Sequence, residues 1–140
     1  GVETYSKGQS RKRGGSSKLI LWNNALINAL STKTSRDVVG DSVWWGRFVE
    51  NAVGLHLCNG LSGTEYGISY WREGDREVDF VVSRGSKTWA IEVKSGRGGK
   101  LSGMDRFRSK YPEAKSLIVG AGGIPLGQSF MSDADIWFKK

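Results

Sequence analysis

Two stretches in which polar and apolar residues alternate lie next to each other in the chain, at residues 77–84 and 87–94. Alternation with a period of two is typical of β-strands, because successive side chains of a strand point to opposite faces of the sheet. The residues between the two stretches are Gly85 and Ser86, and glycine in the first position suits a type II′ turn. We therefore predict a β-hairpin over residues 77–94.

A two-residue turn also predicts which residues of the hairpin face each other. Counting outward from the turn, Asp79 faces Glu92 and Glu77 faces Lys94. Directly opposed residues have Cβ atoms about 4.5 to 5.5 Å apart, and like charges at that distance are destabilising. A divalent cation is the simplest compensation for the two opposed carboxylates.

The same alternation divides the predicted hairpin into two faces. One face is apolar and is expected to be core: Val78, Phe80, Val82, Trp89, Ile91 and Val93. The other face carries the charged residues and two small apolar ones: Glu77, Asp79, Val81, Ala90, Glu92 and Lys94.

The rest of the pattern predicts helices and strands on both sides of this hairpin. Apolar residues at spacings of three and four are typical of helices, and short apolar runs bounded by glycine and polar residues are typical of strands. The predicted helices cover residues 25–30, 42–58 and 102–111, and the predicted strands cover residues 18–22, 67–72, 116–119 and 136–138. Residues 31–40 and 95–100 are expected to be loops. Ser102 and Asp105 resemble a capping box at the start of the last helix.

This order of elements defines the predicted fold class. From residue 42 onward, a helix, a three-stranded antiparallel meander, a second helix and a further strand follow one another. Because a strand that follows a helical crossover runs parallel to the strand before it, strand 116–119 should lie parallel to strand 87–94. We expect one α/β domain over residues 18–140 with an N-terminal strand-helix lead-in, and a basic, flexible linker or leading edge over residues 1–17.

The helix predicted at residues 42–58 carries a carboxylate among apolar residues. Glu50 lies on one stripe with Gly46 and Gly54. Glycine inside a helix costs about 1 kcal/mol relative to alanine, so these glycines indicate a close approach of the backbone to another part of the molecule. A buried carboxylate needs a cation or hydrogen-bond donors. A salt bridge to Arg47 or to another arginine at the rim is the alternative to a metal ion.

Composition and charge restrict the classes of function. The chain has 140 residues, of which 38% are hydrophobic and 25% charged, and its longest apolar runs are far too short to span a bilayer, so we expect a cytoplasmic protein without membrane contact. The single cysteine, Cys58, excludes an intrachain disulfide, and the single histidine, His56, excludes most histidine-rich metal sites. The chain has 21 Lys and Arg but only 14 Asp and Glu, and this excess of positive charge favours a nucleic acid as partner, in particular DNA.

A carboxylate on the first long helix, an Asp on the second strand and a Glu-X-Lys sequence on the third occur in this order at Glu50, Asp79, Glu92 and Lys94. This arrangement resembles the PD-(D/E)XK nuclease superfamily, whose restriction-endonuclease-like core has the predicted order of elements. Val78 stands where the superfamily's name has Pro. The wider sequence around these residues resembles an uncharacterised domain at the C-terminus of prokaryotic AAA-type ATPases.

The resemblance implies metal-dependent hydrolysis of phosphodiester bonds. Mg²⁺ or Mn²⁺ would be held by Asp79 and Glu92, with the backbone carbonyl of Val93 as a further ligand. Glu50 would complete the site, either by binding the metal ion through a water molecule or by orienting Lys94. Lys94 would position the attacking water or stabilise the charge that develops on phosphorus. Glu77 is expected to pair with Lys94. Candidate phosphate contacts are five basic residues around the site: Arg72, Arg97, Lys100, Arg106 and Arg108.

Two other interpretations remain at this stage. The domain can be a catalytically inactive module that binds nucleic acid, or one that docks a partner, in either case next to an upstream AAA ATPase module. The sequence also leaves open whether the domain forms a homo-oligomer. The excess of positive charge supports nucleic-acid binding by an active nuclease and by an inactive binding module alike, so charge does not distinguish these two interpretations.

Overall fold

The computed structural model describes residues 1–7, 16–21, 34–96 and 101–139. The strands are β1 (Glu3–Thr4), β2 (Gly67–Glu73), β3 (Arg76–Arg84), β4 (Lys87–Lys94) and β5 (Lys115–Gly120). The helices are α2 (Ser35–Gly40), α3 (Ser42–Leu61), α4 (Ser102–Lys110), α5 (Leu126–Met131) and the short 3₁₀ helix η1 (Ile136–Phe138).

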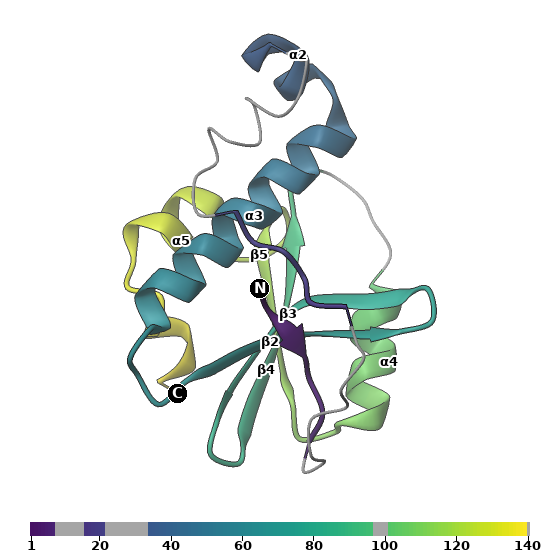
Figure 1. Ribbon diagram of the computed structural model, residues 1–140, viewed down its shortest axis with the longest axis vertical. Coiled ribbons are helices and arrows are strands. Elements are labelled where there is room, and N and C mark those ends of the chain that lie inside the picture. Colours follow the sequence, from purple (N-terminus) through teal and green to yellow (C-terminus); the bar gives the residue numbers. More distant parts are fainter. Residues whose placement is uncertain (8–15, 22–33, 97–100, 140) are drawn as a thin grey trace.

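The strands form a mixed sheet in the order β1-β2-β3-β4-β5. β2, β3 and β4 are an antiparallel meander, β5 runs parallel to β4, and β1 runs parallel to β2. Helices α3 and α5 lie on one side of the sheet, and α4 lies on the other (Figure 1). The predicted α/β fold class is therefore confirmed. None of the helices within the described residues is long and apolar enough to cross a membrane.

The sheet has a hydrophobic core on each face. Under α3, side chains of the helix such as Val53 and Leu57 pack against Phe80 and Trp89 of the sheet. Under α4, Phe107 packs against Trp71 and other sheet residues, and it is fully buried. A sheet covered on both faces explains why the charged face predicted for the hairpin also contains the completely buried residues Val81 and Ala90.

The predicted hairpin forms with the predicted turn and register near the turn. Gly85 has φ +57°, and no residue other than glycine has a positive φ in the described chain, which agrees with a type II′ turn. The ladder extends from the Arg84–Lys87 pair to the Phe80–Ile91 pair. Asp79 and Glu92 lie one step beyond that last pair, so they are not ladder partners as the sequence predicted.

A β-bulge in β3 changes the faces of the residues beyond Phe80. Ser69 pairs with Val81 but Trp71 pairs with Val78, so β3 has one residue more than β2 between these two pairs. Val78 consequently belongs to the core under α4, together with Val81. The prediction that Val78 shares a face with Phe80 was wrong, because a strict period of two does not allow for a bulge.

Helix α3 begins where the sequence predicts and ends three residues later. The side chain of Asp41 caps it by accepting hydrogen bonds from the backbone N–H groups of Val43 and Trp44. The backbone of α3 lies close to the sheet at Gly54, where a Cβ atom would be 2.7 Å from the ring of Phe80. The close approach predicted from the helix glycines is therefore present at Gly54.

Several shorter elements differ from the prediction. Part of the predicted loop 31–40 is helix α2, which a Thr34–Asp37 pair of reciprocal hydrogen bonds caps. The predicted edge strand 136–138 is the 3₁₀ helix η1, because its aromatic residues pack on the face of the sheet rather than pair with its edge. The predicted strand 18–22 is reduced to a single bridge between Lys18 and Val2, with Trp22 outside the described residues.

Three further comparisons with the prediction concern helices. The short helix predicted at residues 25–30 lies outside the described residues. Helix α5 was not predicted at all. Helix α4 begins at Ser102 and ends before Pro112 as predicted, but its N-cap residue is Leu101 and no side chain caps it, so the predicted capping box is not formed.

The first residues of the chain are part of the sheet. Val2 is buried, Glu3–Thr4 is strand β1, and Tyr5 packs against Phe107. The expectation of a flexible leading segment therefore does not hold for residues 2–5. Composition alone misses this, because a two-residue strand needs only one buried side chain and the hydrogen bonds of a neighbouring strand.

Candidate metal centre

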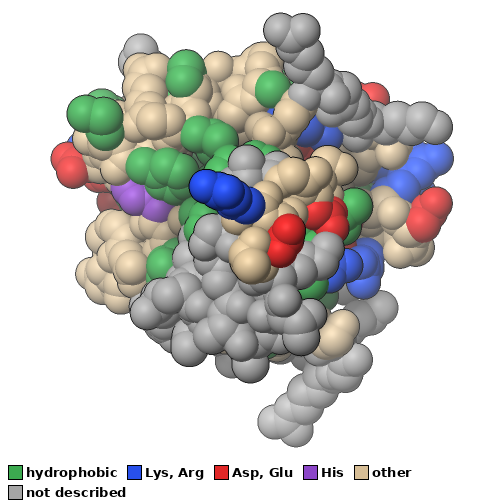
Figure 2. Space-filling view, turned by 90° about the horizontal axis from the view of Figure 1, so that it is seen from above, with side chains coloured by type: hydrophobic (Ala, Val, Ile, Leu, Met, Phe, Trp, Pro, Cys, Tyr) green, Lys and Arg blue, Asp and Glu red, His purple; other side chains and the backbone are tan. Residues whose placement is uncertain are grey.

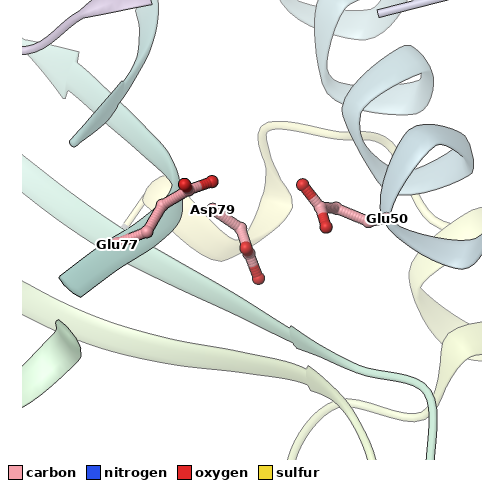
Figure 3. Close-up of side chains that lie close together, drawn as sticks. All are labelled: Glu50, Glu77 and Asp79. Atoms are coloured by element: carbon pink, nitrogen blue, oxygen red, sulfur yellow. The ribbon is translucent and has the colours of Figure 1, made fainter. Parts of the chain in front are cut away.

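Three carboxylates from two elements converge beside the sheet. Glu50 comes from α3, and Glu77 and Asp79 come from β3 (Figure 3). One oxygen of each lies within 4.8 Å of one oxygen of each of the others, a spacing that can hold a metal ion. We call these three residues the acidic cluster.

The bulge and the glycine of α3 explain why the acidic cluster forms. Strict alternation would turn Asp79 toward the α4 side with Val81, but Asp79 is part of the bulge and its side chain lies on the α3 side. Gly54 lets α3 pack closely on Phe80, and Glu50 lies one turn before it on the same face of the helix. The two features together bring a helix carboxylate next to a strand carboxylate.

Lys18 places its ammonium group in the middle of the acidic cluster. Lys18 Nζ forms an ion pair with Glu50, lies 2.9 Å from Glu77 Oε1 and 3.7 Å from Asp79 Oδ1, and donates to the backbone carbonyl of Asp79 at 3.2 Å. Its side chain is only 15% exposed. Lys18 was not predicted, because a lone lysine that lies far in sequence from Glu50, Glu77 and Asp79 carries no local signal.

The environment raises the pKa of both Asp79 and Lys18, which favours the neutral form of the aspartate and the charged form of the lysine. Burial is the main cause that raises the pKa of Asp79 to about 7, and the charges of Glu50 and Glu92 add to it, while Lys18 and the N–H of Val93 oppose it. Burial lowers the pKa of Lys18, but the charges of Glu50 and Asp79 together with hydrogen bonds to Glu50 and Glu77 outweigh it and raise that pKa above its ordinary value. The site therefore concentrates negative charge and stabilises a cation.

Glu92 and Lys94 lie beside the acidic cluster on β4. Asp79 Oδ2 accepts a hydrogen bond of 2.8 Å from the backbone N–H of Val93, so the Asp79 side chain continues the contact between β3 and β4 beyond their ladder. Lys94 Nζ donates to Glu92 Oε1 at 3.0 Å. The second oxygen of Glu92, Oε2, is buried and has no hydrogen-bond partner within the described residues.

The ion-pair partners of Glu77 and Glu50 differ from those that the sequence suggested. Glu77 does not pair with Lys94 but with Lys18 and with Arg72, whose Nη2 lies 2.8 Å from Glu77 Oε2. Among the described residues, Glu50 pairs with Lys18, whereas the sequence offered Arg47 or another arginine as the alternative to a metal ion. Arg47 lies over the ring of Trp44 instead, with 5.8 Å between its Cζ and the ring centroid.

The predicted phosphate contacts fall into three groups. Arg97 and Lys100 lie outside the described residues. Arg72 and Arg106 are exposed but hold carboxylates, since Arg106 Nε lies 2.5 Å from Glu73 Oε2. Arg108 is exposed on α4. On the face that Figure 2 shows, Lys and Arg side chains are interspersed with Asp and Glu rather than gathered into one basic surface.

The donor set fits a hard divalent cation. Glu50, Glu77 and Asp79 supply carboxylate oxygens at ligand spacing, and Glu92 Oε2 is a buried acceptor next to them without a donor among the described residues. Oxygen-only donor sets suit Mg²⁺ and Mn²⁺ rather than softer metals. The cluster includes Glu77, which the sequence assigned to a salt bridge. It does not include Glu92, which the resemblance implied as a ligand.

Comparison with known proteins identifies one family. Residues 45–130 match a family described as a domain of unknown function, DUF4143. This range extends from the first half of α3 into α5 and contains all four residues of the predicted nuclease motif. Neither the curated proteins nor the solved structures give a significant match.

Proposed function

This chain belongs to the DUF4143 family, a family of unknown function, and we propose that it is a metal-dependent nuclease domain of the PD-(D/E)XK type that hydrolyses phosphodiester bonds in DNA. The observation that carries the proposal is the convergence of Glu50 from α3 with Asp79 from β3, next to Glu92 and Lys94 of β4. These are the four residues that the resemblance singles out in the sequence.

We assign a distinct role to each of these residues. Asp79 and Glu50 hold Mg²⁺ or Mn²⁺, with Glu77 or Glu92 as the third carboxylate and the carbonyl of Val93 as a further candidate. A bound divalent cation would supply Lewis acidity at the scissile phosphate and lower the pKa of a bound water. Lys94 stabilises the charge that develops on the phosphate, and Glu92 orients Lys94 through the 3.0 Å hydrogen bond between them.

The partners follow from charge and from resemblance. The net charge of +7 favours DNA over neutral or cationic partners. Arg72, Arg106 and Arg108 are our candidates for phosphate contacts, which position a substrate without reading its sequence. An upstream AAA-type ATPase module in a longer protein would deliver the substrate or control access to it.

The test of the nuclease proposal is cleavage of plasmid and branched DNA in the presence of Mg²⁺ or Mn²⁺. We expect cleavage by the wild type and a loss of about 10²- to 10³-fold in rate for both Asp79→Ala and Lys94→Ala. Lys87→Ala, which removes an exposed lysine from the same strand as Lys94, is the matched control and should cleave normally. Equal rates for all four proteins would refute the catalytic assignment.

A second candidate function is a DNA-binding module without catalytic activity. The observation in its favour is that Lys18 pairs with all three carboxylates of the acidic cluster within the chain itself and offsets part of their charge without a metal ion. This function predicts DNA binding that survives both EDTA and the Asp79→Ala change. Metal-dependent cleavage that disappears in Asp79→Ala would exclude it.

A further inference from the structure

The acidic cluster and Lys18 suggest how cation binding at this site is controlled. We propose that Lys18 is an internal occupant of the cation position, and that a divalent cation binds only by displacing the Lys18 ammonium group. This inference rests on the proposed metal centre, but it adds a residue that neither the sequence pattern nor the family match singles out.

Lys18 and a divalent cation compete for the same carboxylates. Lys18 Nζ contacts Glu50, Glu77 and Asp79, and these are the three residues whose oxygens lie at metal-ligand spacing. Mg²⁺ requires oxygen ligands at about 2.0 to 2.1 Å, so an ion bound by Glu50 and Asp79 would lie within a few ångströms of the position that Lys18 Nζ occupies. Two positive charges a few ångströms apart in a largely buried site repel each other strongly. Lys18 and a divalent cation are therefore alternatives.

Hydrogen bonds hold the backbone of Lys18 in place, and its long side chain can rotate away from the acidic cluster. Lys18 N and O form two 2.8 Å hydrogen bonds with Val2, and three residues later the amide of Asn51 bonds both N–H and C=O of Leu21. Displacement therefore requires only rotation of the lysine side chain. The fold around the acidic cluster stays the same in both states.

Competition with Lys18 lowers the apparent affinity of the site for a divalent cation. When the site is free in only a fraction of the molecules, the apparent affinity for the cation is its intrinsic affinity multiplied by that fraction. A lysine ammonium is charged at neutral pH, and Lys18 Nζ is held by Glu50, Glu77 and Asp79, so this competition persists at neutral pH. Without metal, the Lys18 ammonium offsets part of the negative charge of the acidic cluster, and the strength of the Lys18 contacts sets the cost of cation binding.

The experiment measures Mn²⁺ binding by calorimetry to the wild type, Lys18→Met and Lys87→Met. Methionine keeps most of the length of lysine without its charge, and Lys87 is an exposed lysine at the hairpin turn, far from the acidic cluster. We expect Lys18→Met to bind Mn²⁺ at least about tenfold more tightly than the wild type, and Lys87→Met to bind as the wild type does. Unchanged or weaker binding by Lys18→Met would overturn the inference.

Thermal unfolding gives a second readout on the same proteins. Without metal, Lys18→Met should unfold at a lower temperature than the wild type, because three carboxylates lose their counter-charge. With saturating Mn²⁺, its unfolding temperature should rise by more than that of the wild type. Equal rises in both proteins would contradict the displacement of Lys18.

Asp79→Ala separates failure of this inference from failure of the proposed metal centre. Mn²⁺ binding that is equal in wild type and Lys18→Met but absent in Asp79→Ala refutes the inference alone. No binding by either of the first two proteins refutes the metal centre and the inference together.

If Lys18→Met does not fold, carbon-13 NMR of the lysine Cε groups in the wild type tests the same point. Titration with Mg²⁺ should shift the Lys18 resonance along the binding curve and leave that of Lys87 unchanged. A Lys18 resonance that does not move while calorimetry detects binding would overturn the inference.

Discussion

At the scale of single residues, Asp79 is the residue on which the candidate site depends. Burial raises the pKa of its carboxyl to about 7, and the charges of Glu50 and Glu92 add to this rise. The carboxylate also bonds the backbone N–H of Val93 where the ladder of β3 and β4 has ended. Asp79 therefore joins three elements, α3, β3 and β4, and its removal affects both the charge and the local geometry of the site.

The third carboxylate of the metal centre can be identified by substitution. We expect Glu92→Gln to weaken Mn²⁺ binding by about 10- to 100-fold and Glu77→Gln to weaken it much less. The reason is that Glu92 Oε2 is buried without a donor among the described residues, whereas Glu77 is also held by the exposed Arg72. Calorimetry with Mn²⁺ measures both variants. A larger loss in Glu77→Gln would assign the third position to Glu77.

Sequence reasoning finds some of these residues and not others, for physical reasons. Asp79, Glu92 and Lys94 stand out because a hairpin brings charged residues near each other at a known spacing. Glu50 stands out because a carboxylate inside an apolar helix needs a partner. Lys18 could not be found, because its contact with the acidic cluster depends on the tertiary packing of a segment without regular structure.

At the scale of elements, the hairpin and helix α3 follow from local rules, and the shorter elements do not. Strong alternation and a Gly-Ser turn are sufficient to predict β3 and β4, but the bulge that turns Asp79 toward α3 arises from pairing with β2. Helices α2 and α5 have six residues each, too few for a reliable periodic pattern. The composition of residues 136–138 predicts a strand, but these residues form the 3₁₀ helix η1, whose aromatic side chains pack in the core.

The packing of α3 on the sheet is tested by replacing its glycines. Gly54→Ala should lower the free energy of unfolding by about 1 to 3 kcal/mol, because the new methyl group would lie 2.7 Å from the fully buried ring of Phe80. Gly46→Ala is the matched control in the same helix. Its Cβ would meet only the Ser95 hydroxyl, at 3.3 Å, so the higher helix propensity of alanine should leave stability unchanged or raise it by up to about 1 kcal/mol. Urea unfolding compares the two, and equal stabilities would contradict the close approach of α3.

The anchoring of the segment that carries Lys18 is a second test at this scale. Asn51→Ala removes the two side-chain hydrogen bonds that hold Leu21, and we expect a loss of about 1 to 3 kcal/mol in stability together with faster hydrogen exchange at the Leu21 amide. Native-state hydrogen exchange measures both effects. Unchanged exchange at Leu21 would show that other contacts fix this segment.

At the scale of the whole molecule, the excess of positive charge and the acidic cluster have different roles. The excess positive charge attracts an anionic polymer over long distances, while the acidic cluster repels phosphate unless a cation neutralises it. A chain with both features can bind nucleic acid weakly without metal and engage it at the site only when metal is present. This combination distinguishes the proposed nuclease from a purely basic binding protein.

Salt dependence measures the contribution of the basic residues to DNA binding. We expect affinity for duplex DNA to fall linearly with salt concentration on logarithmic axes. Arg108→Ala should reduce the magnitude of that slope by about 1, because Arg108 is exposed and is one of the proposed phosphate contacts. Fluorescence anisotropy in EDTA measures the slope, and a slope that Arg108→Ala leaves unchanged would remove this residue from the interface.

The central claim is that Asp79 and Glu50 form a divalent metal centre, and a crystal structure of the wild type grown with Mn²⁺ tests it most directly. The anomalous scattering of manganese locates the ion without reference to the protein atoms. The account predicts one strong peak bounded by the carboxylates of Asp79 and Glu50, with the Lys18 ammonium moved out of the acidic cluster. A fully formed Lys18 ion-pair cluster without a manganese peak at saturating Mn²⁺ would contradict it.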